Sequence, residues 1–166
     1  CKVNKKIKIV SFSRNFGHQF ALDAGITNAA GDAIIIMDAD LQDPPEVIPK
    51  MIEKWVEGFD VVYAVRSKRE GESWFKKCTA YSFYRIQRFL SDIEIPADTG
   101  DFRLISRRIA DLLVSLPEKD KFFRGLIPWL GFKQASITYD RHERFAGTTK
   151  YTLSQMTKLG MSGLLS

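Results

Sequence analysis

The sequence predicts a layered α/β fold, and three observations support this prediction. Segments with the period of a strand and segments with the period of a helix alternate from residue 7 to residue 65. Residues 33–37 form a continuous apolar run, as expected for a strand that a parallel sheet buries on both faces. With 166 residues, of which 45% are hydrophobic, the chain is long enough to bury a core.

The first half of the chain alternates predicted strands and helices. Residues 7–13 alternate in polarity and predict a strand, and residues 16–30 predict an alanine-rich helix. After the apolar run, Asp43-Pro44-Pro45-Glu46 is typical of a helix start, with Asp as the N-cap and Pro in the first turn. The apolar face of this helix consists of Ile48, Met51, Ile52, Trp55, Val56 and Phe59. Residues 60–65 predict the next strand.

The second half is less regular. Residues 73–90 predict an aromatic helix with a basic face, and residues 102–105 predict a short strand. A helix follows, closed by Pro117, whose apolar face consists of Ile109, Leu112, Leu113 and Leu116. Residues 135–139 alternate like a half-exposed strand, and residues 141–150 read as a polar, basic loop.

The composition excludes several classes of protein. With 27% charged and 45% hydrophobic residues, the chain is neither a disordered polymer nor a multi-span membrane protein. Cys1 and Cys78 cannot form a disulfide framework and lack the spacing of a zinc site, which favours a reducing, cytoplasmic setting. The net charge of +5 suits an anionic partner, although it is also compatible with a merely basic surface.

The sharpest chemical feature is a pair of carboxylates directly after the apolar strand. Asp38 and Asp40 follow residues 33–37, at the end of a strand where open α/β sheets bind ligands. In an extended chain both side chains point the same way, because side chains repeat with a period of two. Such a pair suits Mg²⁺ or Mn²⁺ shared with a diphosphate, and Gln42 can add a carbonyl oxygen. The alternative is that both carboxylates only cap turns.

At this point the sequence resembles a known family. Asp38-Ala39-Asp40-Leu41-Gln42-Asp43-Pro44-Pro45-Glu46 resembles the metal and nucleotide-sugar motif of family 2 glycosyltransferases. The closest resemblance is to their polyprenyl-phosphate branch, that is, to bactoprenol-phosphate glucosyltransferases and dolichol-phosphate mannosyltransferases. Further matches, in family order, are Ser13-Arg14-Asn15-Phe16-Gly17-His18-Gln19, Thr99-Gly100-Asp101-Phe102-Arg103-Leu104 and Arg144-Phe145-Ala146-Gly147-Thr148-Thr149-Lys150-Tyr151. The resemblance implies a GT-A-type, Rossmann-like fold with a mostly parallel central sheet and helices on both faces.

Departures from the family pattern refine this expectation. The family's first strand, whose Pro-x-Tyr-Asn-Glu segment holds the nucleotide base, would lie before Cys1, and the membrane segments of the bacterial branch would follow Ser166. Asp101 stands where the mannosyltransferases tend to carry Ser, which favours the bacterial branch, and Thr149 replaces a usual Ser. We therefore expect residues 1–166 to be a single catalytic domain, a soluble piece of a longer, membrane-anchored protein.

The resemblance implies an inverting, metal-dependent hexosyltransferase. It would move a sugar, here glucose, from a nucleoside diphosphate sugar such as UDP-glucose to a polyprenyl phosphate of the undecaprenyl or dolichyl type. The reaction would take place at the cytoplasmic face of the cell membrane, with Mg²⁺ or Mn²⁺ and without a nucleic acid partner. Any homo-oligomer would form through segments outside this chain.

The resemblance also implies roles for individual residues. The nucleotide sugar would contact the loop after the apolar strand and one upstream arginine, namely Asp38, Ala39, Asp40, Gln42 and Arg14. The metal ligands would be Asp40, Gln42 and Asp38, with Asp40 also counted as catalytic. The phosphates of donor and acceptor would contact basic residues, namely Arg66, Arg141, Arg144 and Lys150. Asp101 would be catalytic, as a base or as a group that orients the acceptor; the alternative is a loop carboxylate paired with Arg103.

Three other residues near these motifs have weaker functional signals. His18 is expected to be structural, since a lone histidine at an aromatic helix start is no metal site. Lys121 and Arg124 could reach a diphosphate, but the neighbouring phenylalanines indicate a segment that chiefly packs.

Other functions remain open from the sequence alone. One is a glycosyltransferase with another acceptor, and a second is a haloacid-dehalogenase-like phosphatase, whose motif needs Thr or Val where Gln42 stands. A third is a non-catalytic domain that binds polyanions or membranes, which predicts steeply salt-dependent binding to any polyanion.

Overall fold

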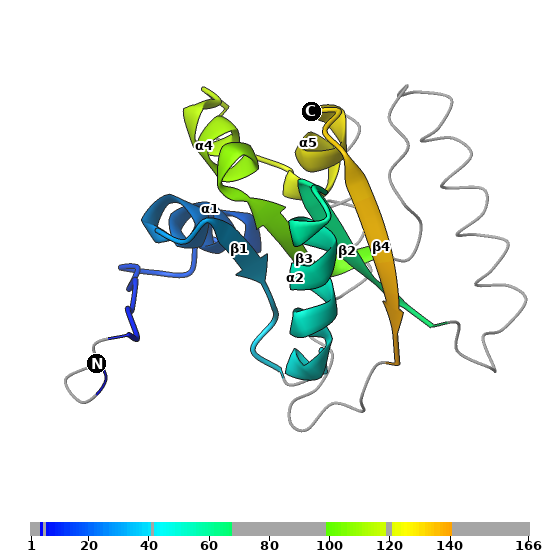
Figure 1. Cartoon of the computed structure of the whole chain (residues 1–166). Helices are drawn as coiled ribbons and strands as arrows, with labels where there is room; N and C mark the ends of the chain where they lie inside the picture. The colour runs from blue at the N-terminus through cyan, green and yellow to red at the C-terminus, as the bar shows by residue number, and fades with distance from the viewer. Residues whose placement is uncertain (1–3, 5, 41, 68–98, 119–120, 141–166) are drawn as a thin grey trace, which may run out of the picture.

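The computed structural model describes residues 4, 6–40, 42–67, 99–118 and 121–140 (Figure 1). The predicted aromatic helix at 73–90 and the basic loop at 141–150 lie outside the described residues. In chain order, the elements are α1 (His18–Asn28), β1 (Ala33–Ile36), the 3₁₀ turn η1 (Pro45–Val47), α2 (Ile48–Val56), β2 (Val61–Arg66), β3 (Thr99–Ser106), α4 (Arg107–Ser115), α5 (Phe123–Trp129) and β4 (Gln134–Tyr139).

The described strands form one mixed sheet in the order β1-β3-β2-β4. β3 is antiparallel to both of its neighbours, and β2 is parallel to β4. β1, β2 and β4 therefore run in the same direction, which confirms the prediction of a mostly parallel sheet. Because β3 is reversed, its first residues lie at the same edge of the sheet as the last residues of β1 and β2.

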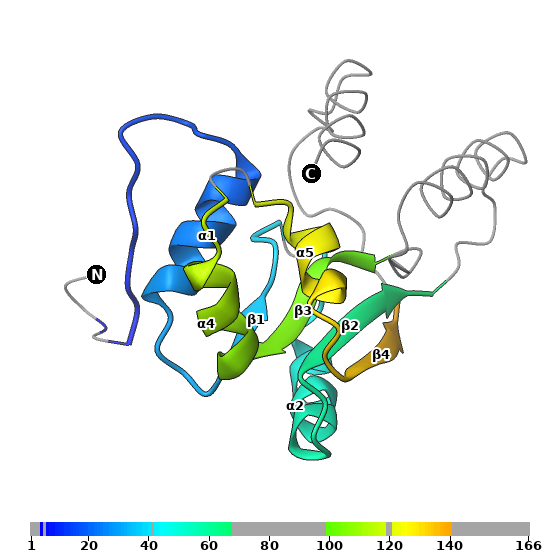
Figure 2. The same cartoon turned by 90° about the horizontal axis from the view of Figure 1, so that it is seen from above.

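Helices cover both faces of the sheet, as predicted (Figure 2). The strands alternate, so that Val61 and Tyr63 of β2 face one core while Val62 and Ala64 face the other. The first core is covered by α1, α4 and α5, which contribute Ile26, Ile109, Ala110, Leu113, Phe123 and Ile127. The second core is covered by η1 and α2, which contribute Val47 and Met51. Burial of these apolar faces is what holds the helices to the sheet.

The start of α2 differs from the sequence prediction. Pro44 is the N-cap residue of η1, without a side-chain capping hydrogen bond, so the prediction that Asp43 caps this helix is wrong. The physical reason is a competing partner, since the Asp43 carboxylate is buried and accepts a hydrogen bond from the Tyr139 hydroxyl.

The predicted strand at residues 7–13 is also wrong. These residues are not in a strand, and none of the described strands pairs with them. Ile9 is 70% exposed, and Ile7, Val10 and Phe12 are exposed as well. A strand requires a hydrogen-bonded neighbour, and an alternating pattern cannot supply one.

None of the described helices has the length and apolarity needed to cross a membrane.

Candidate active site

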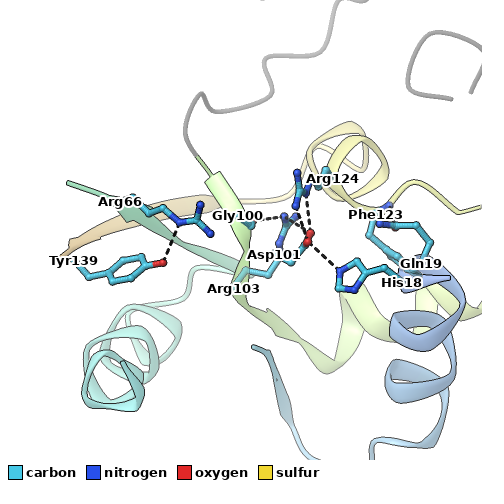
Figure 3. A network of polar contacts seen from close by, with 9 residues as sticks. All are labelled: His18, Gln19, Arg66, Gly100, Asp101, Arg103, Phe123, Arg124 and Tyr139. Carbon is cyan, nitrogen blue, oxygen red and sulfur yellow. Dashed lines mark hydrogen bonds and ion pairs between the residues drawn. The ribbon is translucent and has the colours of Figure 1, made fainter. Parts of the chain in front are cut away.

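The candidate site lies at the edge of the sheet where β1 ends and β3 begins (Figure 3). The chain enters α1 through Gly17, whose φ of 100° is rarely adopted by residues with a side chain, and His18 is the first helical residue. β3 bulges at this edge. Tyr63 pairs with Arg103 and Val65 pairs with Thr99, so residues 100–102 of β3 lie opposite the single residue Ala64 of β2. Bulges of this kind redirect side chains at the rims of sheets.

Asp101, in the bulge, is the centre of an ionic network. Arg124 of α5 donates two hydrogen bonds to its carboxylate, from Nε to Oδ1 at 2.9 Å and from Nη2 to Oδ2 at 2.7 Å. His18 Nε2 lies 3.0 Å from Oδ2. The Asp101 side chain is only 5% exposed, whereas those of His18 and Arg124 are 40% and 37% exposed. A buried carboxylate thus holds a guanidinium and an imidazole that both remain partly open to solvent.

These contacts determine the charge states of the network. Burial alone would raise the pKa of Asp101, but the hydrogen bonds from Arg124 and His18 outweigh it and hold this pKa well below its usual range. The hydrogen bond to Asp101 raises the pKa of His18 above its ordinary value, although burial opposes the shift. The two hydrogen-bond partners thus keep the Asp101 carboxylate ionised in this network.

Arg103 is not the main partner of Asp101, in contrast to the alternative considered from the sequence. Its Nη2 lies 3.7 Å from Asp101 Oδ1 and donates instead to the Gly100 carbonyl oxygen at 2.8 Å. Arg103 is fully buried beneath the network, with its guanidinium 5.2 Å from the centre of the Tyr63 ring. It supports the bulge from inside the core.

The second part of the site is the acidic loop, defined here as Asp38, Asp40, Gln42 and Asp43, after β1. Asp40 Oδ1 accepts a hydrogen bond from the backbone N–H of Gln42 at 3.1 Å, which fixes the turn. Asp38 and Asp40 are half-buried, and Gln42 and Asp43 are buried. Burial raises the pKa of Asp38, and the nearby negative charges of Asp101, Asp43 and Asp40 add to this shift, while His18 opposes it.

The sequence predicts that the acidic loop holds a divalent cation. Within the described part of the chain, no three His, Cys, Asp or Glu side chains come together as a metal cluster. Mg²⁺ commonly needs only one or two carboxylates when a substrate diphosphate supplies further oxygens. Burial is the main cause of the raised pKa of Asp38, and the neighbouring carboxylates add less to the shift. Asp38, Asp40 and Gln42 offer carboxylate and amide oxygens, which are the ligand atoms that Mg²⁺ prefers.

A third group connects β2, β3 and β4 at the same edge. Arg66, the last residue of β2, makes a long hydrogen bond of 3.4 Å from Nε to the Tyr139 hydroxyl oxygen. Its guanidinium lies against Gly100, where an added Cβ would be only 2.9 Å from Arg66 Nη2. Tyr139 in turn donates to Asp43 Oδ1. The position of Arg66 at the strand end agrees with the sequence prediction.

The structure brings together only part of the predicted set. Arg14 lies on the exposed segment before α1, 4.2 Å from the centre of the Phe16 ring, and among the described residues no hydrogen bond or ion pair joins it to the acidic loop. Ala39 is exposed within that loop. The predicted phosphate ligands Arg141, Arg144 and Lys150 lie outside the described residues.

Sequence reasoning missed the contacts of His18 and Arg124 with Asp101 and those of Tyr139 with Asp43 and Arg66. His18 and Arg124 bind Asp101 across separations of 83 and 23 residues, which no local period reveals. Lys121, by contrast, is buried and pairs with Asp23 of α1 at 3.1 Å, which supports the packing role expected for its segment.

Comparisons with known proteins agree with the resemblance. The model of the family described as Glycosyl transferase family 2 matches residues 1–113. The chain is 57% identical over 162 residues to an uncharacterized glycosyltransferase, YkcC, of Bacillus subtilis (strain 168), covering 98% of this chain and 50% of that protein. It is 44% identical over 157 residues to a prophage bactoprenol glucosyl transferase homolog of Escherichia coli (strain K12), covering 95% of this chain and 51% of that protein. With the bactoprenol glucosyl transferase of Shigella phage SfV it shares 43% identity, again over 157 residues, 95% of this chain and 51% of that protein.

The chain thus spans about half the length of the curated relatives it matches. Among solved structures, it is similar to glucosyl-3-phosphoglycerate synthase from Mycobacterium tuberculosis, with a TM-score of 0.53 and 16% identity. That alignment covers 96% of this chain and 56% of the other, and at this identity it supports the fold alone.

Proposed function

Because this chain belongs to glycosyl transferase family 2, we propose that the protein of which it forms part transfers glucose to a polyprenyl phosphate. The donor would be a nucleoside diphosphate glucose, UDP-glucose in particular, and the reaction would take place at the cytoplasmic face of the membrane. The observation that carries this proposal is the 43–44% identity to bactoprenol glucosyl transferases and their homologue over 95% of the chain.

The chemistry of the acceptor supports a positioning role for Asp101. A phosphate monoester carries its second negative charge above about pH 6, so its oxygen can attack the sugar without losing a proton to the enzyme. The new bond joins this oxygen to the anomeric carbon, the bond to the diphosphate breaks, and its electron pair leaves with the nucleoside diphosphate. The configuration at the anomeric carbon inverts. Asp101, held ionised by its partners, would orient His18 and Arg124 toward these phosphates.

The leaving diphosphate is the group whose charge must be stabilised. Asp38, Asp40 and Gln42 would hold Mg²⁺ or Mn²⁺, which supplies Lewis-acid stabilisation of that charge when bound. Arg66, at the end of β2, would add a forked cation suited to phosphate oxygens. Arg141, Arg144 and Lys150 would contribute further positive charge, as the family resemblance implies.

The direct test is a transfer assay on the full-length protein in detergent or vesicles, with undecaprenyl phosphate and labelled UDP-glucose in the presence of Mg²⁺. We expect a labelled lipid, and at least a 100-fold slower reaction for Asp40→Ala. The matched control is Asp32→Ala, because Asp32 precedes the same strand at its opposite end, is exposed, and uses its backbone carbonyl, not its side chain, to accept from Arg107. This control should react like the wild type.

Other donors and acceptors separate the proposal from its alternatives. Labelled UDP-N-acetylglucosamine, UDP-galactose and GDP-mannose test the identity of the sugar, and a soluble acceptor tests the need for the lipid phosphate. Failure to form labelled lipid from any of these donors would overturn the proposed function. Wild-type turnover in Asp40→Ala would remove the acidic loop from the mechanism.

A further inference from the structure

We propose that Tyr139 is a positioning residue of the candidate active site, whose hydroxyl tethers the acidic loop through Asp43 and holds Arg66 beside it. The inference deepens the proposed function and rests on it, because Asp38, Asp40 and Gln42 of the acidic loop, together with Arg66, are the groups assigned there to the donor diphosphate. Tyr139 and Asp43 are not among the residues assigned there to the metal or to the phosphates.

The backbone and the ring of Tyr139 are both fixed. Tyr139 ends β4, opposite Arg66 in the parallel pairing of β2 with β4. Its carbonyl oxygen accepts from the backbone N–H of Ser67 at 2.8 Å and from the Ser67 hydroxyl at 2.9 Å. Its ring packs edge-on against Phe102, with the ring centres 5.7 Å apart and the planes at 89°. The position of the Tyr139 hydroxyl is therefore fixed by the backbone and by the packing of the ring.

The hydroxyl connects two groups of opposite charge. It donates to Asp43 Oδ1 and accepts the long hydrogen bond from Arg66 Nε at 3.4 Å. Tyr139 and Asp43 are both buried, so water cannot readily replace the hydrogen bond between them. Burial and the hydrogen bond to Asp43 raise the pKa of Tyr139, which keeps the hydroxyl protonated as a donor.

The tether acts where the acidic loop needs support. Asp40 is fixed by the backbone of Gln42, and Asp43 is the next residue along the chain. Without an anchor at Asp43, the loop would depend on its own turn to hold carboxylates that repel one another. Gly100 leaves the guanidinium of Arg66 in its present position, since an added Cβ would come within 2.9 Å of Nη2 and displace it.

The test uses Tyr139→Phe in the full-length protein, which removes the hydroxyl and keeps the ring. Hydrogen exchange of peptides that span residues 38–43 should become at least tenfold faster. The affinity for UDP in the presence of Mn²⁺, measured by calorimetry, should fall about five- to tenfold, and the KM for the donor should rise by a similar factor with a smaller change in kcat. A merely structural role would lower the unfolding midpoint but leave UDP affinity and KM unchanged.

The chain offers a matched control in Tyr63→Phe. Tyr63 is also a buried tyrosine of the sheet, but in the described part of the chain its hydroxyl has no hydrogen-bond partner. This variant should leave loop exchange, UDP affinity and KM at wild-type values. Asp43→Asn keeps an acceptor oxygen but loses the charge, so its effect should be intermediate, and it serves if Tyr139→Phe fails to fold.

The outcomes are distinct from those of the proposed function. Loop exchange and UDP affinity that are unchanged in Tyr139→Phe, or in Asp43→Asn if that variant replaces it, would overturn the tether even in an enzyme that transfers glucose. Absence of labelled lipid from the wild type would overturn the proposed function, and the exchange and binding measurements would still decide the role of Tyr139.

Discussion

Replacing Asp101 with asparagine tests whether this carboxylate holds the network together. Asp101→Asn removes the charge and leaves a single acceptor oxygen, while the new NH₂ group faces donors of Arg124 or His18. Hydrogen bonds to buried charged groups contribute about 1.5–3 kcal/mol each. Because the side chains of Arg124 and His18 are 37% and 40% exposed, water recovers part of what their donors lose. We expect a net loss of about 2 kcal/mol in the free energy of unfolding.

The assay is urea unfolding of the full-length protein at pH 7. Because the pKa of Asp101 is depressed in the folded state, its contribution is present above the unfolded pKa of about 3.9 and is lost only as the pH falls toward the folded pKa. The control is Asp111→Asn, which breaks an exposed pair with Arg107 at 3.4 Å whose Asp111 side chain is 65% exposed. We expect less than about 0.5 kcal/mol there. If Asp101→Asn were no worse than this control, with an unchanged urea slope, Asp101 would not be the centre of the network.

Two further substitutions test neighbouring parts of the site. His18 has a raised pKa in the folded state, so its stabilising effect is complete below the unfolded pKa of about 6.5 and disappears as the pH rises through the folded pKa. His18→Gln should therefore cost more stability at pH 5.5 than at pH 8.5, and the difference should be less than about 1 kcal/mol because the side chain is partly exposed. An equal loss of unfolding free energy at both pH values in urea titrations would contradict this. Gly100→Ala should raise the donor KM several-fold by displacing Arg66, with an unfolding free energy within about 1 kcal/mol of the wild type, because the clashing atom is the end of a flexible side chain. Its control is Gly25→Ala, where an added Cβ meets nothing within 4 Å and KM should not change; equal KM values for both variants would rule out the displacement.

The sequence predicts correctly several elements whose residues have the local pattern of a strand or a helix. The apolar run at residues 33–37 becomes β1, and the alternating run at 135–139 becomes β4. Residues 7–13 have a similar pattern but no pairing partner among the described strands. Pattern states which face of a segment is apolar, whereas strand formation also depends on a neighbour that lies far away in the chain.

α5 shows a different limit of sequence reasoning. This helix spans Phe123–Trp129, carries Pro128 within its seven residues and lacks a side-chain cap. Each of these properties disfavours a helix by local propensity. The helix forms because Phe123 and Ile127 are buried against the sheet, a tertiary contact that outweighs local preference.

The candidate site also has a part that could be predicted from the sequence and a part that could not. Asp38, Asp40 and Gln42 are close together in sequence, so their shared loop could be predicted. The partners of Asp101 could not, since His18 lies on α1 and Arg124 on α5, and only the packing of both helices on one face of the sheet brings them to the same carboxylate.

The bulge in β3 constrains the length of the chain at this point. Asp101 and Phe102 are consecutive and face opposite sides of the sheet. The Asp101 side chain contacts Arg124 of α5, and the Phe102 ring packs on Tyr139 in the core that α2 covers. Deleting or inserting a single residue between 99 and 103 would exchange these two faces, placing a carboxylate among apolar groups and a benzyl ring among cations. The number of residues between Thr99 and Arg103 is therefore set by the two environments on opposite faces of the sheet.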